Sequence, residues 1–142
     1  MTFRCSNWIR QGGKLSPLLY NVYRDDLNNH LKATFVGCYV GDAWVNSLSY
    51  ADDMALLAPM VTALQTLLEV CYAYAGLPGP DDIVYNTTKS VCMLLLPKQS
   101  QGRFSTRVRL GNEELSFVEE FCYLEHIITA DCRDEKDIKK QF

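Results

Sequence analysis

The sequence predicts an α+β fold in which two amphipathic helices pack on one face of an antiparallel sheet. Apolar residues recur every three to four positions in two segments, and several shorter segments are rich in β-branched and aromatic residues. Turn-forming residues separate these segments. With 142 residues, 48% of them apolar, the chain has the size and composition of one domain with a hydrophobic core.

The first predicted helix begins at Ser16, because serine is a favoured N-cap and Pro17 suits the first helical position. Its apolar face comprises Leu18, Leu19, Val22, Tyr23, Leu27 and Leu31. The second helix has its apolar face at Val61, Leu64, Leu68, Cys71 and Ala75. Glycines and prolines at positions 76–80 end this second helix.

The predicted strands of the first half are residues 34–40, 43–49 and 54–58, with a turn at Gly41 and Asp42. In the second half they are residues 83–85, 90–96, 106–110, 113–118 and 121–129. Gly111 and Asn112 predict a hairpin between residues 106–110 and 113–118. The charged segment 133–141 favours a helix.

Two adjacent carboxylates, Asp52 and Asp53, lie between the apolar strands 43–49 and 54–58. Like charges repel, and an apolar setting adds to the cost of ionisation. A divalent cation removes both penalties, and Mg²⁺ prefers carboxylate and phosphate oxygens. The pattern therefore predicts a metal site at the tip of an antiparallel hairpin. A surface turn is the alternative, since aspartate is common in turns.

The charges are unevenly distributed around this pair. Net charge is −3, and residues 33–88 contain six acidic residues but no lysine or arginine. Basic residues cluster at positions 4–32 and 89–109. An acidic centre with basic flanks suits a metal site beside a polyanion. Ordinary variation in surface charge is the alternative interpretation.

Four stretches, residues 10–20, 50–53, 86–90 and 121–128, occur in an order that resembles the second half of a reverse transcriptase palm. The resemblance is to polymerases of non-LTR retrotransposons. It covers nearly the whole chain, with residues 133–142 as the start of a thumb. The resemblance implies RNA-directed DNA synthesis with Mg²⁺ or Mn²⁺. The implied partners are an RNA template, a DNA primer and deoxynucleoside triphosphates.

The resemblance also implies roles for individual residues. Asp52 and Asp53 would hold the catalytic metal, and Lys89 would lie near the pyrophosphate leaving group. The incoming nucleotide and template would lie near Arg10, Gln11, Gly12 and Tyr50. The primer strand would be gripped by Tyr123 and Leu124. Structural roles are the alternatives: a core aromatic for Tyr50, a Gly-Gly turn at residues 12–13 and a surface lysine for Lys89. Asn86 is expected to organise the turn before Lys89.

Two departures from the family pattern affect the expected activity. Glu125 stands where similar proteins usually have glycine, and a Cβ suits a tight turn poorly. Residues 1–9 contain no acidic residue, so the first catalytic aspartate strand and the fingers are not represented. We therefore expect the isolated chain to be inactive. The alternatives are a domesticated module that binds protein or RNA, and a translated remnant with no function.

Targeting signals and cysteine usage indicate the cellular compartment in which the chain is expected. No apolar run approaches the roughly 18–20 residues of a membrane span, and the first residues lack the apolar core of a signal peptide. A cytosolic or nuclear protein, not secreted and not in a membrane, is expected. Six cysteines without a CxxC pair predict neither a zinc site nor disulfides.

Overall fold

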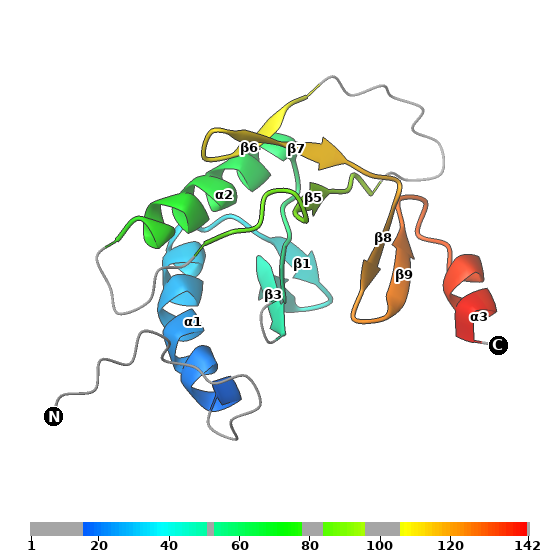
Figure 1. Ribbon diagram of the computed structural model, residues 1–142, viewed down its shortest axis with the longest axis horizontal. Helices are drawn as coiled ribbons and strands as arrows, with labels where there is room; N and C mark the ends of the chain where they lie inside the picture. The colour runs from blue at the N-terminus through cyan, green and yellow to red at the C-terminus, as the bar shows by residue number, and fades with distance from the viewer. Residues whose placement is uncertain (1–15, 51–52, 78–83, 96–105, 142) are drawn as a thin grey trace, which may run out of the picture. The chain divides into compact units, whose positions relative to one another are not determined.

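The computed structural model of the protein describes residues 16–50, 53–77, 84–95 and 106–141. Within these ranges it contains three helices, α1 (Ser16–Ala33), α2 (Val61–Ala75) and α3 (Glu135–Gln141), and nine short strands (Figure 1). The chain divides into two compact units, Met1–Tyr74 and Ala75–Phe142, and each has its own strands and buried side chains. The predicted mixture of helices and strands is confirmed.

The first unit contains two antiparallel hairpins in succession. Strand β1 (Cys38–Val40) pairs with β2 (Ala43–Val45), and β3 (Ser47–Tyr50) pairs with β4 (Asp53–Leu56). The prediction of one strand over residues 43–49 was wrong, because Asn46 divides it between two sheets. The Asn46 side chain is 2% exposed and turns to a helix, which interrupts the strand.

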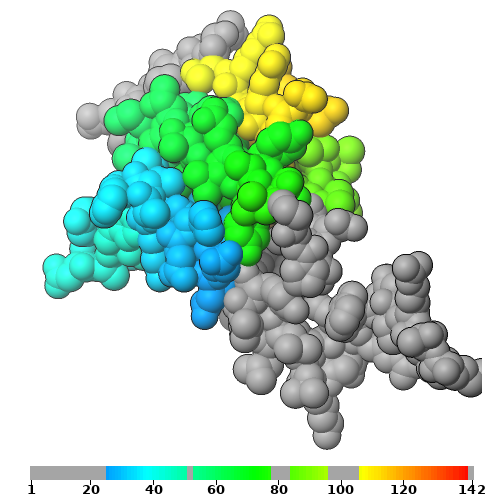
Figure 2. All heavy atoms as spheres, turned by 90° about the vertical axis from the view of Figure 1, so that its left-hand side faces the viewer, coloured from blue at the N-terminus to red at the C-terminus, as the bar shows by residue number. Residues whose placement is uncertain are grey.

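The buried side chains of the first unit come mainly from α1 and α2. They are Leu27, Leu31, Leu67, Leu68 and Cys71. Figure 2 shows the C-terminal part of α1 and α2 packed side by side. The Tyr74 hydroxyl of α2 donates a hydrogen bond of 3.1 Å to the Asp26 carboxylate of α1. The predicted apolar faces are confirmed at four of these positions, and Leu67 widens the face of α2.

The second unit contains a three-stranded sheet in the order β5-β7-β6. Strand β6 (Val108–Leu110) pairs with β7 (Glu113–Phe117), which confirms the hairpin predicted at Gly111 and Asn112. Strand β5 (Val91–Cys92) pairs with β7 in parallel. The buried side chains here are Cys92, Val108, Leu110 and Leu115. Burial raises the pKa of the Cys92 thiol, which favours the neutral form.

Residues 121–129 are a hairpin and not the single strand that we predicted. Strand β8 (Glu120–Tyr123) pairs with β9 (His126–Thr129), and Leu124 and Glu125 form the connection. Both connecting residues have positive φ, 49° and 70°, although neither is glycine. Their sequence carries no glycine, asparagine or proline, the residues that normally mark a turn.

The strands of the described residues form four small sheets, where a single antiparallel sheet was predicted. Several strands are also shorter than expected: the predicted 34–40 is reduced to Cys38–Val40, and 90–96 to Val91–Cys92. Residues 84 and 85 of the predicted strand 83–85 are not in a strand. Among the described helices, none has the length and apolarity to cross a bilayer. Cys38, Cys71, Cys92, Cys122 and Cys132 are free thiols.

Candidate active site

The β3–β4 hairpin carries the carboxylate pair singled out in the sequence. Tyr50 is paired with Asp53 as the last described pair of the ladder, so the predicted antiparallel hairpin is confirmed. The two residues between them, Ala51 and Asp52, lie outside the described residues. Asp53 is exposed, and Tyr50 is 65% exposed. The alternative of a core aromatic at Tyr50 is therefore wrong, and the end of the hairpin faces solvent.

The base of this hairpin is attached to α1. The Asn46 amide donates a hydrogen bond of 2.8 Å to the Leu31 carbonyl, near the end of α1 where carbonyls lack a helical partner. The Asn46 carbonyl accepts the Leu57 N–H at 2.8 Å, and the Ser47 hydroxyl donates to Asn28 at 3.3 Å. A buried asparagine thus links the helix to both strands that carry Tyr50 and Asp53.

The donor set near this hairpin has the chemistry that Mg²⁺ prefers, since Asp53 offers carboxylate oxygens. Among the described residues, no group of three or more histidine, cysteine or acidic side chains lies close enough together to hold a metal ion. Asp52, the other residue of the predicted metal pair, lies outside the described residues.

Lys89 follows a turn that Asn86 organises, as predicted. The Asn86 carboxamide oxygen accepts the Thr88 hydroxyl at 2.6 Å and the Lys89 N–H at 3.1 Å. The Asn86 carbonyl accepts the Ser90 N–H at 3.0 Å. The side chain of Lys89 is exposed and β5 begins two residues later, so the turn presents a cation beside an ordered strand.

The β8–β9 hairpin carries the predicted primer-gripping pair. Tyr123 is half-buried and pairs with His126, and Leu124 at the tip is 40% exposed. Glu125 completes the two-residue turn with a φ of 70°. Positive φ at both central residues is the geometry of a type I′ turn, which usually requires glycine or asparagine. Glu125 therefore has a backbone conformation that glycine favours, although it carries a Cβ.

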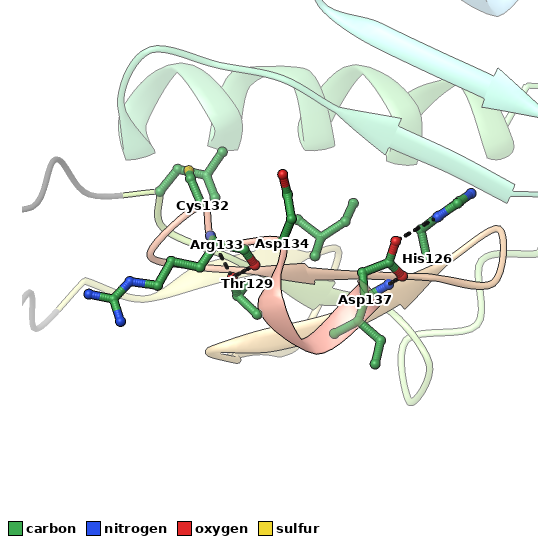
Figure 3. A pocket seen from close by; sticks show the side chains of 9 residues that line it. His126, Thr129, Cys132, Arg133, Asp134 and Asp137 are labelled. Atoms are coloured by element: carbon green, nitrogen blue, oxygen red, sulfur yellow. Dashed lines mark hydrogen bonds and ion pairs between the residues drawn. The ribbon is translucent and has the colours of Figure 1, made fainter. Parts of the chain in front are cut away.

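Helix α3 contacts this hairpin through polar side chains. The Asp137 carboxylate accepts the Ile127 N–H at 2.8 Å and the His126 Nδ1–H at 2.9 Å (Figure 3). These two hydrogen bonds, from His126 first, lower the pKa of the Asp137 carboxyl. Lys136 forms an ion pair with Glu120, which raises the pKa of the lysine.

A hollow of about 380 Å³ lies beside β9, the loop after it and α3. Figure 3 shows His126, Thr129, Cys132, Arg133, Asp134 and Asp137 around it. Its polar side chains are bonded locally, because Thr129 donates to Asp131 at 2.7 Å and accepts the Arg133 N–H at 3.1 Å. The Thr129 hydrogen bond also lowers the pKa of the Asp131 carboxyl. This hollow is thus built around structural hydrogen bonds.

The predicted site residues fall into three groups. Tyr50 and Asp53 lie in the first compact unit, and Lys89, Tyr123 and Leu124 lie in the second. The remaining predicted residues, Arg10, Gln11, Gly12 and Asp52, lie outside the described residues. Sequence reasoning missed Asn46, Asp137 and Lys140 because asparagine, aspartate and lysine are ordinary surface residues. Only their contacts with distant backbone distinguish them.

Comparison with known proteins identifies the class. Residues 1–111 match the family model for reverse transcriptase (RNA-dependent DNA polymerase), so the chain belongs to the reverse transcriptase family. A stretch of 71 residues is 35% identical to a protein of Drosophila melanogaster, the retrovirus-related Pol polyprotein from type-2 retrotransposable element R2DM. That match covers 50% of this chain and 7% of the polyprotein. No solved structure matches significantly. The predicted relation to a reverse transcriptase of the retrotransposon type is confirmed.

Proposed function

We propose that this chain is the C-terminal part of the palm of an RNA-directed DNA polymerase of a non-LTR retrotransposon. The observation that carries the proposal is the Tyr50–Asp53 hairpin, an antiparallel pair with solvent-facing ends that lies within the matched family region. The partners would be an RNA template, a DNA primer and deoxynucleoside triphosphates. Residues 133–142 would begin the thumb.

In this proposal Asp52 and Asp53 hold Mg²⁺, or Mn²⁺ in its place. The metal would neutralise charge on the triphosphate and lower the pKa of the attacking hydroxyl. Lys89, presented by the Asn86 turn, would offset the charge that develops on the leaving pyrophosphate. Arg10, Gln11, Gly12 and Tyr50 would contact the incoming nucleotide and the template. Tyr123 and Leu124 would hold the primer strand.

The 142 residues by themselves would not extend a primer. The first nine residues contain no carboxylate, and phosphoryl transfer depends on complete positioning of metal, nucleotide and primer. Fusion to an upstream segment of a related element, one that supplies an aspartate strand and fingers, should restore extension on an RNA template.

The test is primer extension by this fusion and by four variants of it. Asp52→Asn keeps the shape of the side chain but removes its charge, and should abolish extension. Asp42→Asn is the matched control, because Asp42 is exposed in the β1–β2 turn, and it should leave extension unchanged. Lys89→Ala should lower kcat more than it raises KM, whereas Lys32→Ala at the end of α1 should change neither. Extension that survives Asp52→Asn would refute the role of Asp52, and extension by the isolated chain would refute its expected inactivity.

A further inference from the structure

The tip of the β8–β9 hairpin has a conformation that its own sequence does not favour. Leu124 and Glu125 have φ angles of 49° and 70°. Side chains with a Cβ are strained in this left-handed region, where glycine is not. Two other described hairpins have two-residue connections, and each places a glycine of positive φ at the first connecting position, Gly41 and Gly111, where this hairpin has Leu124. Contacts from outside the tip must therefore contribute to its geometry.

Helix α3 supplies such contacts along the whole length of the hairpin. Lys136 pairs with Glu120 at the base, and Asp137 bonds His126 and Ile127 of the two pairs next to the tip. Lys140 donates a hydrogen bond of 2.7 Å to the Glu125 carbonyl at the tip. Positions 136, 137 and 140 lie on one side of a helix, so one side of α3 contacts the hairpin from its base to its tip.

The contact to Ile127 uses a backbone group that the hairpin leaves unpaired. Tyr123 and His126 form the closing pair, so the next pair, Cys122 and Ile127, directs its N–H groups away from the partner strand. Asp137 accepts the Ile127 N–H at 2.8 Å. Its side chain is 19% exposed, against 61% for His126, so it is the more shielded member of this pair.

The Lys140 contact acts on the strained residue itself. A hydrogen bond to the Glu125 carbonyl fixes the direction of the peptide group that leaves the turn, directly after the residue with a φ of 70°. Lys140 Nζ also lies 3.6 Å from the Cys122 Sγ of β8. The ammonium group thus contacts both the strand and the tip.

We propose that Lys140 and Asp137 of α3 are positioning residues that hold the β8–β9 tip in its left-handed turn and thereby set how Tyr123 and Leu124 meet the primer strand. The role in primer contact rests on the proposed function. The role in holding the conformation of the tip does not, and the two roles are tested by separate measurements. A glycine at position 125 would tolerate the positive φ without this support.

The test uses the full 142-residue chain and five variants: Lys140→Met, Asp137→Ala, Glu125→Gly, the double variant Glu125→Gly/Lys140→Met, and Lys139→Met as the matched control. Three-bond HN–Hα couplings and backbone chemical shifts report φ at residues 124 and 125. Titration of the same variants in the upstream fusion with a fluorescent RNA–DNA hybrid that has a recessed DNA 3′ end reports primer binding.

We expect Lys140→Met and Asp137→Ala to shift the tip signals out of the left-handed range. They should weaken hybrid binding about five- to tenfold, because only the fraction with a formed tip binds. Lys139→Met should change neither measurement. In the double variant, glycine should restore both the shifts and the affinity although Lys140 is gone, which a general loss of stability would not produce.

Two outcomes would overturn the inference, and they are distinguishable. Unchanged tip signals in Lys140→Met and Asp137→Ala would refute the positioning role, whatever the hybrid does. Tip signals that shift as expected, with hybrid affinity equal in all variants or absent in the parent fusion, would establish the positioning of the tip and refute its role in primer contact. That second result would count against the proposed function.

Discussion

The β3–β4 and β8–β9 hairpins have the same length and pairing, but different contacts hold them. Each has four antiparallel pairs, closed by a tyrosine opposite a polar residue, Tyr50 with Asp53 and Tyr123 with His126. The first is attached at its base, where the buried Asn46 reaches the end of α1. The second is attached along its side and at its tip, by exposed residues of α3.

This difference indicates which substitutions should affect the stability of a whole unit and which should affect only a local conformation. Buried contacts such as those around Asn46 contribute to the stability of a whole unit, because water cannot replace them. Exposed ion pairs contribute little to global stability. They can still select between conformations of a short segment. We therefore expect large effects on unfolding from changes near the base of β3–β4, and small, local effects from changes around β8–β9.

The largest effect should follow from Leu31→Ala. The side chain is 0% exposed, and its removal leaves a cavity beneath the attachment of β3–β4. We expect a loss of about 2–5 kcal/mol in the free energy of unfolding, measured by urea denaturation. Leu48→Ala, at a site that is 49% exposed on β3, should cost well under half as much. Equal losses would contradict the burial assigned to Leu31.

The second effect is that of Asn46→Ala, which removes the amide donor to Leu31. The Leu31 carbonyl also accepts the Thr34 hydroxyl at 2.7 Å and the Thr34 N–H at 3.2 Å, so it keeps two partners. We therefore expect a loss of only about 1–2 kcal/mol in urea denaturation. Amide hydrogen exchange in β3 and β4 should accelerate, while exchange in β8 and β9 stays unchanged. Asn29→Ala, exposed on α1, is the control and should fall within about 0.5 kcal/mol of the parent.

The third substitution should increase the free energy of unfolding, whereas the first two decrease it. Glu125→Gly relieves the strain of a Cβ at a φ of 70° and should stabilise the second unit by about 0.5–1 kcal/mol. Thermal unfolding would measure it. The reverse change in a sister hairpin, Gly111→Ala, imposes a Cβ at a φ of 62° and should destabilise by a similar amount. Destabilisation by Glu125→Gly would show that the tip is not strained.

The smallest effect should be a response to acid. The pKa of Asp137 is lowered in the folded chain by the hydrogen bonds from His126 and Ile127. The carboxylate therefore stabilises the fold above its unfolded pKa of about 3.9, and this contribution is lost as pH falls through the lower folded value. Hydrogen exchange at the Ile127 amide should accelerate over that range. Asp137→Asn should remove most of this acid dependence, and Asp134→Asn should retain it.

The sequence predicted those helices and hairpins that are encoded by residues within the element itself. Two helices follow from their apolar periodicity, and the β6–β7 hairpin follows from Gly111 and Asn112. The Asp pair predicted the β3–β4 hairpin, because polar residues interrupt an apolar segment there. In each case a few neighbouring residues carry the information, and no distant contact is needed to choose the conformation.

The remaining features depend on contacts between distant residues. Asn46 divides a strand because its side chain reaches Leu31, 15 positions away. The β8–β9 turn forms at Leu124 and Glu125 without a turn residue, with Lys140 bonded to the Glu125 carbonyl. Of the candidate site, the sequence placed Asp53 on a hairpin and Lys89 after an Asn86 turn. It gave no sign of the contacts between α3 and the hairpin that carries Tyr123 and Leu124.

The arrangement of α3 on its hairpin also bears on how the chain folds. Asp137 and Ile127 are 10 residues apart, and Lys136 and Glu120 are 16 apart. The Tyr74 to Asp26 contact between α1 and α2 spans 48 residues. Closing a shorter loop costs less chain entropy, and contacts between near neighbours in sequence form faster. Residues 120–141 should therefore collapse within microseconds to milliseconds as an early folding nucleus of the second unit, ahead of the docking of α2 on α1.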